Sequence, residues 1–75
     1  MDHVVTTLKD IVRIYYKKIN VQTTPENEYD VRKNTIREAI IRASPGMKND
    51  VLFNTLFPSV FGIVYCEDKL RKQSC

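Results

Sequence analysis

The stretch SPGMKNDVLFNTLFPSVFGIVYC, residues 44–66, decides the fold because it is the most apolar part of the chain. It holds all three phenylalanines and two of the three prolines. Apolar residues three and four apart predict a helix that begins near Asn49 and ends at Phe57. Proline is tolerated in the first turn of a helix, so a short fourth helix is expected from Pro58 to Lys72. The β-branched and aromatic run over residues 60–66 also fits a strand, and this alternative stays open.

Two amphipathic helices are expected before this stretch. Residues 2–20 carry apolar side chains at helical spacing and end in basic residues, which the helix dipole favours. Residues 25–43 form the second, with Thr24 as cap, Pro25 in the first turn and a stop at Pro45. The sequence therefore predicts an all-α fold, a small bundle of three to four short helices, in one domain over residues 1–75.

Composition argues against catalysis and against a membrane span. The only histidine is His3, and it has no metal-ligand spacing to Cys66 or Cys75, so no enzyme, cofactor or small-molecule substrate is expected. Cys66 is expected to be a buried, inert thiol. The chain lacks an apolar run long enough for a membrane helix and has no signal peptide pattern at Met1, which predicts an intracellular protein of the cytoplasm or nucleus.

The apolar residues between positions 52 and 65 cover too much of a helix circumference for one buried face. Two interpretations stay open with equal weight: a central core element, or an interface with a protein partner or a second copy in a homodimer. Large rigid side chains dominate interface energies, so the phenylalanines are the expected anchors. The candidate partner-binding residues are Leu52, Phe53, Leu56, Phe57, Phe61 and Tyr65.

An alternative function is binding of nucleic acid by a basic, helix-turn-helix-like protein. The net charge is +3, and three basic residues share one face of the first expected helix. A second polar group surrounds the turn before the third helix, in the place that such a motif uses for DNA. A solvated face is the favoured interpretation of the first group, and an ordinary helical hairpin is the favoured interpretation of the second. The residues of this alternative are Lys9, Arg13, Lys17, Arg42, Lys48 and Asn49.

Overall fold

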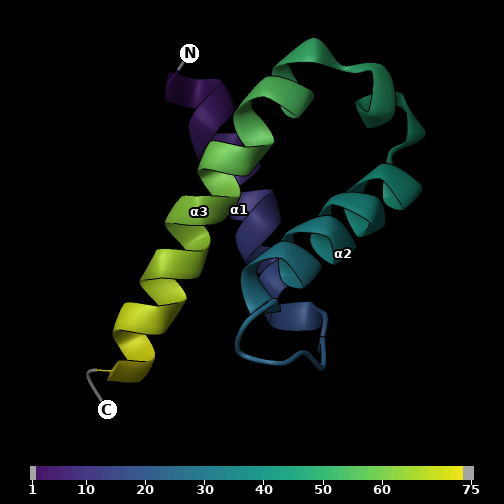
Figure 1. Cartoon of the computed structure of the whole chain (residues 1–75). Coiled ribbons are helices and arrows are strands. Elements are labelled where there is room, and N and C mark those ends of the chain that lie inside the picture. The colour runs from purple at the N-terminus through teal and green to yellow at the C-terminus, as the bar shows by residue number, and fades with distance from the viewer. Residues whose placement is uncertain (1, 74–75) are drawn as a thin grey trace.

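The computed structural model describes residues 2–73. Within these residues the chain forms three α-helices, α1 (Asp2–Lys18), α2 (Glu28–Ala43) and α3 (Val51–Gln73), with one 3-10 helix, η1 (Pro45–Asn49), and no strand. The prediction of a small all-α bundle is confirmed, with three helices as its count in the described part. Figure 1 shows α3 crossing α1, while α2 returns beside them and η1 leads back to the start of α3.

The break predicted at Pro58 is wrong, because α3 is one continuous helix of 23 residues that contains Pro58. Proline inside a helix costs about 3 kcal/mol, since it removes one backbone hydrogen bond and crowds the preceding turn. The Pro58 ring lies on the exposed side of α3, whereas buried side chains both precede and follow it on the opposite side. Burial on both sides of the proline offsets its local cost. The strand alternative for residues 60–66 is excluded by the same helix.

The start of α2 also differs from the prediction. The backbone N–H and the hydroxyl of Thr24 both donate to Oδ1 of Asn27, at 3.2 and 2.9 Å. The Asn27 N–H returns a bond to the Thr24 carbonyl at 3.2 Å. These bonds close a turn in which Pro25 supplies the fixed φ angle, so α2 begins three residues later, at Glu28.

Asp50, not Asn49, caps α3. Its Oδ1 accepts the Phe53 N–H at 3.1 Å, whereas Asn49 belongs to η1. The cap satisfies one of the backbone donors left free in the first turn of a helix.

The core is organised around a ridge of rings on α3, in which successive members are four residues apart. Phe53 and Phe57 have ring centroids 5.3 Å apart, and Phe57 and Phe61 have theirs 6.0 Å apart. Tyr16 of α1 and Tyr29 of α2 meet Phe61 from the two sides, at 6.0 and 5.3 Å. Side chains of all three helices complete the core, in which the buried apolar residues are Leu8, Val12, Tyr16, Ile36, Ile40, Phe53, Phe57, Val60, Phe61 and Val64.

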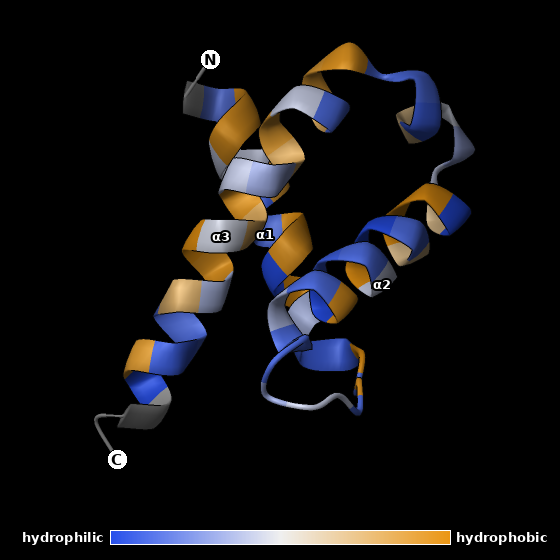
Figure 2. Ribbon diagram, in the orientation of Figure 1, coloured by the Kyte–Doolittle hydropathy of each residue, from blue (hydrophilic) through white to orange (hydrophobic). Residues whose placement is uncertain are grey.

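Hydropathy is distributed unevenly over the helices. In Figure 2 the ribbon of α2 is mostly blue in this view, whereas α3 carries hydrophobic orange segments along much of its length. α3 packs most extensively against α1 and also contacts α2 and η1. Even so, these neighbours cover only part of its circumference.

Candidate functional site

The predicted partner-binding residues divide between the core and the surface. Phe53, Phe57 and Phe61 are buried, so a partner that docks on the folded chain does not reach the rings expected to be its anchors. Tyr65 is half-buried, and its hydroxyl donates to a carboxylate oxygen of Glu28 at 3.4 Å. Leu52 is exposed and Leu56 is half-buried, and whether a partner contacts them stays a prediction.

An uncovered apolar strip runs along α3 on the side away from α1 and α2. Its large members keep much of their surface in water: Leu52 is 46% exposed, Ile63 43% and Leu70 63%. The half-buried Leu56 joins this strip to the core, and the other positions are small residues. We call the strip the α3 outer face, and its residues are Leu52, Leu56, Ser59, Ile63, Cys66 and Leu70.

Cys66 corrects another expectation. Its thiol is free and exposed, on the outer face, rather than buried in the core. The helical spacing that buries Val60 and Val64 turns position 66 outward, which a prediction from residue type alone misses.

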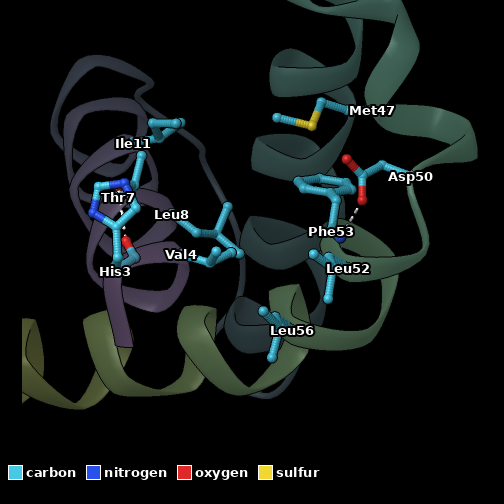
Figure 3. Close-up of a pocket in the computed structure, with 10 residues that line it drawn as sticks. All are labelled: His3, Val4, Thr7, Leu8, Ile11, Met47, Asp50, Leu52, Phe53 and Leu56. Atoms are coloured by element: carbon cyan, nitrogen blue, oxygen red, sulfur yellow. Dashed lines mark hydrogen bonds between the residues drawn. The ribbon is translucent and has the colours of Figure 1, made fainter. Parts of the chain in front are cut away.

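An apolar groove adjoins the outer face at the start of α3. Figure 3 shows side chains of α1 on one wall and those of η1 and α3 on the other. The groove has a volume of about 200 Å³, and its lining residues are His3, Val4, Thr7, Leu8, Ile11, Met47, Asp50, Leu52, Phe53 and Leu56. Its volume is below that of pockets for drug-sized ligands and suits one or two aliphatic side chains.

Two polar side chains of this groove are engaged in local bonds. The Thr7 hydroxyl donates to the His3 carbonyl at 2.9 Å, and the Asp50 carboxylate caps α3. Apart from the His3 imidazole, the other lining side chains are apolar, so the groove favours an apolar occupant. Sequence reasoning missed it because its two walls lie more than 30 residues apart in the chain and no local pattern joins them.

The basic residues on α1 are paired with an acidic residue of α3. Nη2 of Arg13 donates to both carboxylate oxygens of Glu67, at 3.1 and 2.9 Å, and Nζ of Lys9 lies 3.7 Å from the same group. The hydrogen bond from Arg13 holds the pKa of Glu67 below its ordinary value. Lys17 is exposed one turn further along α1. The basic face predicted for nucleic acid is thus partly neutralised within the chain.

The second predicted basic group lies elsewhere. Arg42 is exposed in the last turn of α2, and Lys48 and Asn49 are exposed in η1. The Lys48 carbonyl accepts a bond from the Asn54 side chain at 3.0 Å, which ties η1 to α3. The exposed surface of α3, which would be the recognition helix of a helix-turn-helix motif, carries the apolar outer face, with Asn54 and Thr55 as exposed polar side chains near its start.

Glu28 forms a second ionic cluster, between α2 and α3. Its carboxylate accepts bonds from Nζ of Lys69 at 2.7 Å and from Nε of Arg32 at 3.1 Å. The Lys69 hydrogen bond is the main cause that lowers the pKa of Glu28. This cluster joins α2 to α3.

Across residues 2–73, no cluster of three or more histidine, cysteine or acidic side chains could hold a metal ion. None of the helices in this range is long and apolar enough to span a bilayer. Comparison of the chain with protein-family models, curated proteins and solved structures finds no match. The candidate functional site is therefore identified from the surface of this chain alone.

Proposed function

We propose that this chain is a non-enzymatic protein–protein interaction module, and that its docking surface is the α3 outer face together with the adjoining groove. The observation that carries the proposal is the exposure of Leu52, Ile63 and Leu70 along one side of a helix whose phenylalanines are buried in the core. Burial of leucine and isoleucine side chains lowers the free energy by about 25 cal/mol for each Å² of apolar surface removed from water. A contiguous apolar strip beside an apolar groove is typical of an interface.

The alternative of nucleic-acid binding has weaker support. Phosphate contacts need accessible cations, and two of its candidates, Lys9 and Arg13, face Glu67 in ion pairs. The exposed Lys17, Arg42 and Lys48 are distributed over α1, α2 and η1. The alternative requires affinity for DNA or RNA that falls steeply with salt, so an absence of binding at low ionic strength excludes it.

The proposal can be tested with a photo-crosslinking amino acid placed at Leu52, in the chain expressed in its native cells. The matched control carries the same group at Asp30, which is exposed on α2 far from the outer face in sequence. We expect a discrete protein adduct from position 52 and none from position 30. The substitution Ile63→Asp, about three helix turns along the outer face from Leu52, should abolish the adduct from position 52, because a carboxylate disfavours an apolar contact.

Adducts of equal yield from both probe positions would contradict the proposal. So would an adduct at position 52 that survives Ile63→Asp in a variant that remains helical, because contact there would not depend on the outer face.

A further inference from the structure

The α3 outer face has the spacing of a coiled-coil seam. Its six members, from Leu52 to Leu70, are separated by 4, 3, 4, 3 and 4 residues. This is the heptad pattern by which one helix packs along another, knobs into holes. At about 1.5 Å per residue the seam is about 27 Å long. Neither α1 nor α2 occupies it, so the seam has the form of a helix-binding surface without its helix.

The sizes of the side chains favour a second α3 in antiparallel orientation. If two copies cross at residue 61, Leu56 of one copy lies opposite Cys66 of the other, and Ile63 lies opposite Ser59. Large side chains then face small ones, which allows the layers to interlock without voids. A parallel pair would instead place serine opposite serine and leave space at the centre. The antiparallel arrangement also places the two helix dipoles side by side in opposite directions, which is favourable.

The same register brings the two remaining apolar features of the chain together. Leu70 is the most exposed of the large apolar members of the seam, at 63%, and it lies opposite Leu52, which lines the groove. Each copy would thus insert its Leu70 into the groove of the other.

We propose that the docking surface binds a second copy of this chain in a twofold, antiparallel α3–α3 dimer, with Leu70 of each copy in the groove of the other. This inference rests on the proposed function, because it names the occupant of the same surface. Twofold symmetry uses one patch on both chains, and here groove and leucine lie at opposite ends of one seam, as that symmetry requires.

The area of the seam predicts a reversible dimer. A strip about 27 Å long and about 10 Å wide has a flat footprint of about 270 Å² on each copy. The total of about 540 Å², increased by the insertion of Leu70, is below the roughly 1,200 Å² of the smallest stable interfaces. Dissociation constants between about 10 µM and 1 mM are therefore expected.

Site-specific disulfide formation tests the register directly. Both native cysteines are first replaced, Cys66→Ser and Cys75→Ser, and then either Leu52→Cys or Leu70→Cys is added, giving two single-cysteine chains. After mild oxidation of the mixed chains we expect the heterodimer that joins position 52 to position 70. Each chain oxidised alone should remain at least tenfold less crosslinked, because in the antiparallel dimer its two cysteines lie at opposite ends of the seam. Homodimers joined at position 52 or at position 70, or no crosslink in the mixture, would overturn the inference.

Sedimentation equilibrium of the natural sequence gives an independent readout. We expect the average mass to rise with concentration up to 1 mM, and Leu70→Asp to raise the dissociation constant at least tenfold while the helical signal is kept. A monomer at every concentration would overturn the dimer. If the photo-adduct at Leu52 then contains another protein, the interaction module stands without the dimer, whereas equal adducts at Leu52 and Asp30 would remove both.

Discussion

The substitution Phe61→Ala should remove a large fraction of the stability of this fold. The ring is completely buried, and its centroid lies 5.3 Å from that of Tyr29 and 6.0 Å from those of Tyr16 and Phe57. Truncating a buried phenylalanine to alanine costs about 3–5 kcal/mol, as lost burial and as a cavity. At about 0.05–0.15 kcal/mol per residue, a chain of 75 residues has only about 4–11 kcal/mol of stability in total. The variant should therefore lose about half of its stability or unfold.

Chemical unfolding followed by circular dichroism at 222 nm measures this effect, at low micromolar concentration to keep the chain monomeric. The matched control is Ile63→Ala, on the same helix but 43% exposed, which should cost less than about 1.5 kcal/mol. The reasoning is refuted if Phe61→Ala unfolds within 1 kcal/mol of the natural sequence, or if the two variants lose equal stability. The rings of α3 would then be dispensable to the fold and the core would lie elsewhere.

Three further predictions concern an ionic cluster, a glycine within α3 and a helix cap. Lys69 and Arg32 lower the pKa of Glu28 in the folded chain, so their stabilising effect is complete above the ordinary pKa of 4.5 and is lost as the pH falls through the folded pKa. During acid titration below pH 4.5, Glu28→Gln should therefore lose less stability than the natural sequence. A Cβ at Gly62 would lie 3.3 Å from Oη of Tyr29, so Gly62→Ala should stabilise the chain by about 0.5–1 kcal/mol in a Tyr29→Phe background and by less in the natural one, measured by urea unfolding. Asp50→Ala removes the α3 cap and should lower the free energy of unfolding by about 1 kcal/mol, whereas Asp50→Asn should retain most of it, and equal losses would contradict the capping role.

The helical type of the three apolar segments followed from local spacing, but the limits of the helices did not, and the expected fourth helix is part of α3. The sequence predicts a helix boundary at Pro58 because the rule for proline considers only its neighbours in sequence. What keeps α3 continuous is burial of Phe57 and Phe61 against two other helices, a tertiary term that local sequence does not contain. The predicted caps differ from the observed helix starts, Asn49 by one residue and Thr24 by three, because the sequence offers a second capping residue near each start.

The sequence also indicated that α3 holds more apolar surface than one buried face can hide. It could not say which residues would be exposed, because that depends on where α1 and α2 approach the helix. The three phenylalanines entered the core, whereas Leu52, Ile63 and Leu70 remained exposed. The groove was beyond sequence reasoning altogether, since His3 and Leu56 become neighbours only in the folded chain.

Packing of the first described helix against the last has a consequence for synthesis. Arg13 and Tyr16 bond to Glu67 and Asp68, across more than 50 residues of chain. While the ribosome has not yet delivered α3, the apolar face of α1 has no permanent cover, and α2 offers few substitutes. Folding must therefore wait for nearly the whole of this segment to emerge, and the nascent chain depends on speed or on chaperones to avoid aggregation.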